Sequence, residues 1–445
     1  MDKGVFGRLG RLAIVVGLVV AVGTGCSAGA SPNPGDSGGP GGAPPGDAPP
    51  GGGGSQTETS GTAVTMFSTD TSQSSTGYTS TGADENAVRV EGGATVHLTS
   101  PTVNKTGDSS STDNSDFYGM NAAILVRAGG VLSLSGGVIT TAASGGNGIF
   151  VYNTPSSATI SDATIRTSKD NSGGVEVAGG GQITASNLDI VTQGNSAAAI
   201  RSDRGGGTMN VSGGTYTTNG TGSPAVYSTA AISVSEATLT ANNSEAVVIE
   251  GANSVSLTDC TVTGNMAGTY GADSGENIHA MMIYQSMSGD ATQGGGAFSM
   301  SGGSLTGVSG DLFYVTNTTA TINLRNVKLT GGTGNLLTVA GNDGSQGWGS
   351  LGSNGGSVTL TAAQQSMSGA IEVDSISSLD MTLSQGSTFT GTINSTNQAG
   401  QVKVTLSADS QWVLTADANI SAFSGSTADI VAQGHHVYAD GQQIV

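Results

Sequence analysis

A unit of 21 to 35 residues recurs along most of the chain, and this repeat limits the folds that the chain can adopt. Each unit begins with Asn or Ser, continues with a short apolar run, and passes through a turn into two alternating strands. The clearest starts are Asn86, Asn121, Asn147, Ser172, Ser196, Ser223, Ser244 and Asn277, at intervals of 35, 26, 25, 24, 27, 21 and 33 residues. Because most intervals lie in the low to mid twenties, we interpret the longer ones as insertions.

Within a unit the apolar residues alternate with Ser and Thr. Residues 131–141 read Val-Leu-Ser-Leu-Ser-Gly-Gly-Val-Ile-Thr-Thr, and residues 158–167 and 231–240 follow the same pattern. A period of two is typical of a strand with one buried face. Turns rich in Gly, Asn, Asp and Ser separate the strands, so each unit is expected to hold about three short strands and no amphipathic helix.

A unit of this length cannot enclose its own core, so successive units must stack. If they wind as coils of one helix, like strands pair in parallel and the inward apolar residues form continuous ladders. The pattern predicts an all-β fold, a single right-handed parallel β-helix of about twelve coils over residues 63–445. We expect residues 63–85 to cap one end and residues 411–438 the other, because a solenoid needs closed ends. A β-propeller, with its longer period, fits less well.

The net charge of the chain restricts the classes of partner that it can bind. The sequence holds 13 Lys and Arg against 32 Asp and Glu, a net charge of −19. Nucleic acid binding needs cations that neutralise phosphates, and binding to anionic lipid needs a basic surface. Both kinds of partner are therefore excluded from the prediction, which leaves attachment to a membrane through a lipid anchor only.

The first 62 residues predict export and anchoring. Residues 1–25 have the layout of a signal peptide, with a basic start and an apolar run over residues 12–22. The following Gly23-Thr24-Gly25-Cys26-Ser27 resembles a bacterial lipobox, which implies that Cys26 is lipidated, although the usual Leu is absent. Residues 26–62 are rich in Pro, Gly and Ser and predict a disordered linker. The remaining cysteine, Cys260, is expected to be a buried small apolar residue.

The coil pattern over residues 86–410 resembles bacterial right-handed parallel β-helix proteins, the pectin-lyase-like superfamily in its adhesin-type, surface-displayed branch. That resemblance implies the fold and a place at the cell envelope. It does not select one activity, because superfamily members include polysaccharide lyases, glycoside hydrolases and non-catalytic adhesins.

Catalytic candidates are few. The Asn-Thr-Asp, Asp-Asp, Gly-His-Gly and Arg-Ile-Lys elements of polygalacturonase-like hydrolases do not occur in the sequence. The candidates for a lyase are Arg201, Asp203 and Arg204, and Arg201 could lie beside Glu176 of the adjacent coil if the register slips by one residue. An outward Glu–Arg ladder with a loop ion pair is the favoured interpretation. The four histidines have no zinc-binding spacing, and no cofactor is predicted.

Aromatic residues give the candidates for ligand binding. The longest insertions are residues 102–119, 263–276, 286–296 and 342–356. Two of these insertions are rich in polar residues and contain Tyr118 and Trp348. Tyr152, Tyr227 and Tyr284 occupy similar places in their units and could form an aromatic patch. Flat aromatic rings stack on sugars, so the five residues are candidates for glycan binding. Half-buried packing of these tyrosines in the coil wall is the favoured interpretation.

The sequence thus favours a non-catalytic surface lipoprotein that binds an extracellular polysaccharide or a host or cell-surface protein. A polysaccharide lyase or related enzyme, and a structural envelope protein, are the alternatives.

Overall fold

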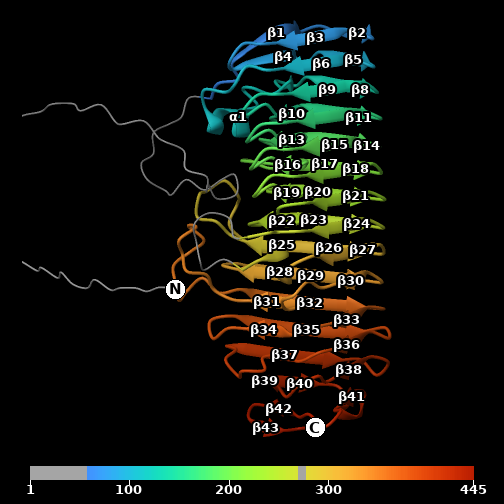
Figure 1. Cartoon of the computed structure of the whole chain (residues 1–445), viewed down its shortest axis with the longest axis vertical. Coiled ribbons are helices and arrows are strands. Elements are labelled where there is room, and N and C mark those ends of the chain that lie inside the picture. Colours follow the sequence, from blue (N-terminus) through green and yellow to red (C-terminus); the bar gives the residue numbers. More distant parts are fainter. Residues whose placement is uncertain (1–57, 269–276) are drawn as a thin grey trace, which may run out of the picture. The chain divides into compact units, whose positions relative to one another are not determined.

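The computed structural model describes residues 58–268 and 277–445. The predicted signal peptide, Cys26 and the linker up to residue 57 lie outside the described residues. The described residues form an all-β solenoid with three long parallel sheets (Figure 1). Stacked coils with like strands in register confirm the predicted parallel β-helix.

Sheet A has twelve strands and sheet B fourteen, and every pairing within them is parallel. In order along sheet A they are β1 (Thr62–Phe67), β4 (Glu85–Val90), β7 (Ile124–Val126), β10 (Ile149–Tyr152), β13 (Val175–Ala178), β16 (Ile200–Ser202), β19 (Val226–Ser228), β22 (Val247–Glu250), β25 (His279–Tyr284), β28 (Asp311–Thr316), β31 (Leu337–Val339) and β34 (Ile371–Val373). In order along sheet B they are β2 (Thr71–Ser74), β5 (Thr95–Thr99), β8 (Val131–Ser135), β11 (Ser157–Ser161), β14 (Gly181–Ser186), β17 (Gly207–Ser212), β20 (Ala231–Ser235), β23 (Ser254–Thr258), β26 (Gly296–Ser301), β29 (Thr319–Arg325), β32 (Ser357–Ala363), β35 (Ser378–Ser384), β37 (Gln401–Leu406) and β40 (Ala422–Ser424).

Sheet C has ten strands, and two short sheets continue the stack to the C-terminus. Sheet C consists of β3 (Gly77–Ser80), β6 (Thr102–Lys105), β9 (Val138–Thr141), β12 (Thr164–Thr167), β15 (Asp189–Thr192), β18 (Thr215–Thr218), β21 (Thr238–Ala241), β24 (Thr261–Gly264), β27 (Ser304–Gly307) and β30 (Lys328–Thr330). The short sheets contain β33 (Ser366–Ser368), β36 (Thr388–Thr390), β38 (Gln411–Val413) and β41 (Ile430–Val431), and β39 (Ala418–Ile420), β42 (Val437–Ala439) and β43 (Gln442–Gln443).

Ladders of inward side chains form the core. One ladder of sheet A runs through Ile124, Ile149, Val175, Ile200 and Val226, which pair in direct register and are fully buried. Each such aliphatic side chain contributes about 2 kcal/mol on burial. The alternation seen in the sequence therefore produces one continuous core.

The polar residue that starts each unit turns the chain into sheet A. The Ser172 hydroxyl donates to the Ala143 carbonyl at 2.6 Å and accepts from the Gly146 amide at 3.0 Å. Two coils further, Ser223 does the same with Gly194 and Ala197. Buried backbone groups at the corner need such partners, which explains why Ser or Asn recurs there.

One sequence expectation about the ends is wrong. Residues 63–85 are not a separate cap, because β1, β2 and β3 pair in parallel with β4, β5 and β6 and form the first coil. One helix, α1 (Thr112–Tyr118), interrupts the repeat inside the insertion 102–119, and a 3₁₀ turn spans Thr427–Asp429. At the C-terminal end β42 and β43 pair antiparallel and close the last coil.

Candidate functional site

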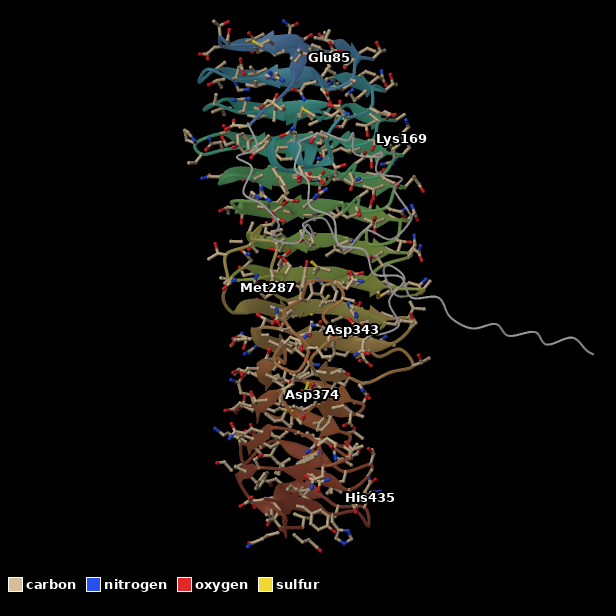
Figure 2. All side chains as sticks on the ribbon, turned by 90° about the vertical axis from the view of Figure 1, so that its left-hand side faces the viewer. Glu85, Lys169, Met287, Asp343, Asp374 and His435 are labelled. Carbon is tan, nitrogen blue, oxygen red and sulfur yellow. The ribbon has the colours of Figure 1, made fainter. Side chains whose placement is uncertain are left out.

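The outer flank of sheet A is covered by insertions. Its outward side chains in successive strands include Leu125, Phe150, Glu176, Arg201 and Tyr227, all of them fully buried. Helix α1 lies over the upper coils of this flank (Figure 1), and segments 285–295 and 341–355 lie over lower ones. Figure 2 looks onto this side, where Met287 and Asp343 mark the two segments. The insertions make sheet A the place where polar groups far apart in sequence meet.

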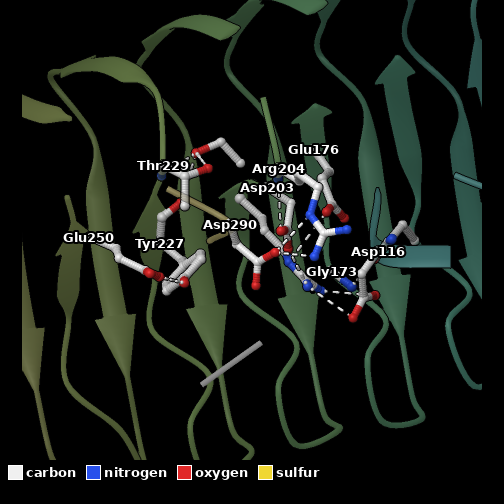
Figure 3. Close-up of polar contacts among 12 residues, drawn as sticks. Asp116, Gly173, Glu176, Asp203, Arg204, Tyr227, Thr229, Glu250 and Asp290 are labelled. Atoms are coloured by element: carbon white, nitrogen blue, oxygen red, sulfur yellow. Dashed lines mark hydrogen bonds and ion pairs between the residues drawn. The ribbon is translucent and has the colours of Figure 1, made fainter. Parts of the chain in front are cut away.

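Arg201 is the centre of a buried ionic cluster. Its Nη2 lies 2.8 Å from Asp203 Oδ2 and 3.1 Å from Asp116 Oδ2, and its Nε lies 3.3 Å from Glu176 Oε1. Asp116 lies in α1, Glu176 lies in β13, and Asp203 directly follows β16 (Figure 3). The four side chains are at most 4% exposed. Arg201 thus ties the covering helix to the sheet.

This cluster corrects two details of the sequence interpretation. Glu176 pairs directly with Arg201 in the ladder between β13 and β16, so no register slip is needed. The pair is not part of an outward, solvated ladder, because α1 excludes water from it. A buried arginine with three carboxylates is a far more constrained arrangement than a surface ion pair.

Burial controls the protonation of the cluster. It raises the pKa of Asp116, raises that of Glu176 well above its usual range, and raises the pKa of Asp203 to about 8. Burial opposes the charge on Arg201, but the neighbouring carboxylates hold its pKa well above the usual value. Neither carboxylate oxygen of Glu176 accepts a hydrogen bond from the described residues. Protons on some of the carboxylates therefore offset the excess negative charge.

Arg204 lies at the rim of the cluster and reaches solvent. Its Nε donates to Asp290 Oδ1 at 2.7 Å, and its Nη2 donates to the same oxygen. Its guanidinium carbon lies 3.8 Å from the centroid of the Phe117 ring. The Arg204 side chain is 43% exposed, whereas that of Asp290 is 2% exposed. Phe117 and Asp290 therefore fix a guanidinium that a ligand could still touch.

Tyr118 and Tyr152 lie beside this rim. Both are half-buried, and their ring centroids are 5.4 Å apart at an interplanar angle of 87°. Tyr118 follows Phe117 at the end of α1, and the centroids of their rings are 6.4 Å apart. We call Tyr118, Tyr152 and Arg204 the α1 patch. It brings together two of the sequence's candidates for glycan binding, Tyr118 and Tyr152, and one of its candidates for a lyase, Arg204.

The ends of α1 set the position of the patch. Ser111 caps its start, accepting a hydrogen bond from the Asn114 amide at 3.2 Å. Gly119 ends it with φ of +67°, and a Cβ there would lie 2.7 Å from Leu125 Cδ1. Only glycine satisfies both the backbone and the packing at this position.

The other three aromatic candidates, Tyr227, Tyr284 and Trp348, are buried and do not present an exposed binding surface. Tyr227 and Tyr284 both donate to Glu250 Oε2, and Ser286 donates to its other carboxylate oxygen. Trp348 packs on Tyr284 with ring centroids 4.9 Å apart. The covering segments remove these rings from solvent, and burial raises the pKa of both Glu250 and Tyr227. Tyr227 and Tyr284 are packed in the wall of the coil, as the favoured interpretation of the tyrosines expected.

Sequence reasoning missed four residues of the site: Asp116, Phe117, Glu250 and Asp290. Three of them lie in segments recognised as insertions, but nothing in the repeat indicates which coil an insertion contacts. Asp116 of α1 contacts Arg201, which is 85 positions away along the chain, and Asp290 contacts Arg204, which is 86 positions away. An insertion that carries both an acid and an aromatic residue, as 102–119 does, was the available signal.

Within residues 58–268 and 277–445, no group of three His, Cys, Asp or Glu side chains is placed to hold a metal ion. Cys260 is buried and has no disulfide partner in this part of the chain. No helix among the described residues is both long and apolar enough to cross a membrane.

Comparison with known proteins supports the fold. Residues 101–281 match the model of a family described as a right handed beta helix region. No curated protein matches the chain. The match extends from β6 to the middle of β25. The chain therefore contains a right-handed β-helix region, consistent with the pectin-lyase-like superfamily.

Proposed function

We propose that the chain is a non-catalytic cell-surface lipoprotein that binds an extracellular glycan at the α1 patch. The observation that carries this proposal is the meeting of two half-exposed tyrosines with a fixed, half-exposed arginine on one flank of the solenoid. Aromatic rings supply stacking area for a sugar ring, and a guanidinium donates to its hydroxyl or acidic oxygens. An extracellular protein presenting such groups is the second kind of partner.

The burial of Arg201 supports a binding role over catalysis. A lyase needs a base within hydrogen-bond reach of its substrate. Arg201 and Asp203 are fully buried, and Arg201 is held by three carboxylates at distances of 2.8 to 3.3 Å. A substrate would reach them only if α1 moved away. The cluster is better explained as the support that positions α1 and its two aromatic residues.

The test is a glycan and polysaccharide array on the purified chain, with the absorbance of unsaturated products recorded for every acidic hit. We expect binding without product. Tyr118→Ala and Tyr152→Ala should each weaken binding about tenfold, the loss of roughly 1.4 kcal/mol of stacking. Tyr438→Ala is the control, because Tyr438 is also half-buried but lies on β42 at the far end of the stack.

Two outcomes would favour the alternatives. Product formation that is lost in Arg204→Gln would favour the lyase, because Arg204 is the one member of the candidate catalytic set that reaches solvent. An array without any bound glycan or cell-surface protein would favour a structural envelope protein.

A further inference from the structure

The N-terminal end of the solenoid presents three open strand edges. β1, β2 and β3 are each the first strand of their sheet, so none has a neighbour on that side among the described residues (Figure 1, top). In a parallel ladder a strand uses alternate backbone groups for each side. About half of the backbone donors and acceptors of these strands therefore point away from the stack, unpaired within the described residues.

These edges lack the features that usually prevent strand pairing. The three strands have 6, 4 and 4 residues and contain no charged residue and no proline. On β1, Val64 is 53% and Met66 51% exposed. At the opposite end the last strands β40, β41 and β43 have 3, 2 and 2 residues, and a hairpin closes the coil. Within the part of the chain that the structure describes, the C-terminal end of the solenoid is thus protected against strand pairing and the N-terminal end is not.

Residues 58–61 lead into β1 along the flank of the solenoid and not across its end. Arg89 Nη2 donates to the Thr62 carbonyl at 2.8 Å and also to the carbonyl of Ser60, which is buried. Arg127, which follows the third strand of sheet A, donates to the Ser60 hydroxyl and lies 3.4 Å from Glu58. Residue 58 therefore lies about two strand spacings, roughly 10 Å, from the end.

Charge does not oppose pairing at this end, although the whole chain is acidic. The two nearest carboxylates, Asp70 and Asp84, turn toward the following coils. There they accept hydrogen bonds from the amides of Thr95 at 2.9 Å and Ser110 at 2.7 Å. Inside the coil, Phe67 packs edge to face on Tyr78, with ring centroids 6.3 Å apart. The end is a neutral, partly apolar surface bordered by backbone hydrogen-bonding groups.

We propose that a second copy of this chain docks here, first coil against first coil, in a two-fold symmetric dimer. A two-fold axis across the rod reverses the strand direction, so the edges pair antiparallel. β1 then pairs with β1 of the second copy. β2 of each copy pairs with β3 of the other, and these two strands have equal lengths. The edges supply on the order of ten interchain hydrogen bonds, as many as a typical protein interface contains.

The experiment is sedimentation equilibrium of the full chain, purified in detergent, through the micromolar range. We expect a dimer that dissociates on dilution. The double variant Val64→Lys/Met66→Lys places four like charges at the junction and should be monomeric with an unchanged circular dichroism spectrum. Val131→Lys is the control: Val131 is 37% exposed on β8, inside the stack, and this variant should remain dimeric.

Gln73→Glu provides a second variant should the lysine variant fold poorly, because exposed Gln73 on β2 pairs in register with buried Leu98 below it. It should also weaken the dimer. A monomeric wild-type chain, as expected if the chain's own N-terminal residues cover the edge, would overturn the proposal. A dimer that persists in both charged variants would do the same.

Discussion

At the scale of single residues, Arg201 is a fully buried cation held by three carboxylates. It compensates three buried carboxylates, and within the described residues no other cation forms a salt bridge with them. We expect Arg201→Met to lower the free energy of unfolding by about 3–5 kcal/mol, because it leaves buried acids without a partner. Arg166→Met is the matched control: Arg166 pairs with Asp189, but their side chains are 39% and 49% exposed. Its cost should stay below about 1 kcal/mol. If urea unfolding showed equal losses of free energy in the two variants, Arg201 would not be the residue that compensates the buried carboxylates.

Asp203 should make the stability of the protein depend on pH. Its pKa is about 8 in the folded protein and about 3.9 in an unfolded chain. Between these values the folded state binds more protons than the unfolded state. Stability therefore decreases as pH rises from about 4 to 8. Asp203→Asn removes this group's titration and should flatten the dependence of Tm on pH.

Asp409→Asn is the control for the pH series, because Asp409 is exposed and a hydrogen bond from Ser407 lowers its pKa. It should leave the decrease above pH 5 unchanged. Parallel curves for wild type and Asp203→Asn would show that Asp203 is ionised in the folded protein.

At the scale of elements, α1 holds the patch in place, and Gly119 is its most sensitive position. Gly119→Ala combines a positive φ with a contact of 2.7 Å to Leu125. We expect a cost of about 1–3 kcal/mol, faster hydrogen exchange over residues 112–118, and weaker glycan binding. Gly289→Ala has φ of +86° but no atom within 4 Å of the added Cβ. It should leave exchange in α1 unchanged, and equal exchange in both variants would contradict this role.

The elements also separate what the sequence predicts from what it does not. Strands are predictable because inward residues such as Leu132 and Leu134 alternate with serines. The start residues Ser172 and Ser223 also satisfy the same corner of their coils. Helix α1 was missed because its seven residues, TDNSDFY, contain no apolar period. It is stable through its caps and through the contact of Asp116 with Arg201. The site depends on such contacts between distant segments, which no local pattern records.

At the scale of the whole molecule, each coil contacts its two neighbours along the stack, so stability is local as in other repeat proteins. The two tryptophans of the chain report on different coils. Trp348 packs on Tyr284 of β25, whereas Trp412 of β38 donates from its indole nitrogen to the Gly391 carbonyl at 3.0 Å. Trp412→Phe and Trp348→Phe therefore give two single-tryptophan proteins for the two regions.

The introduction of Arg201→Met into both single-tryptophan proteins tests how far a local defect spreads. Arg201 lies in β16, three strands of sheet A before β25, whereas β38 lies beyond the last strand of that sheet. Nearest-neighbour coupling predicts that the urea midpoint reported by Trp348 falls more than the midpoint reported by Trp412. One cooperative transition would instead shift both midpoints equally. Equal shifts would mean that the core ladders couple the whole stack, and that α1 and the C-terminal coils unfold together.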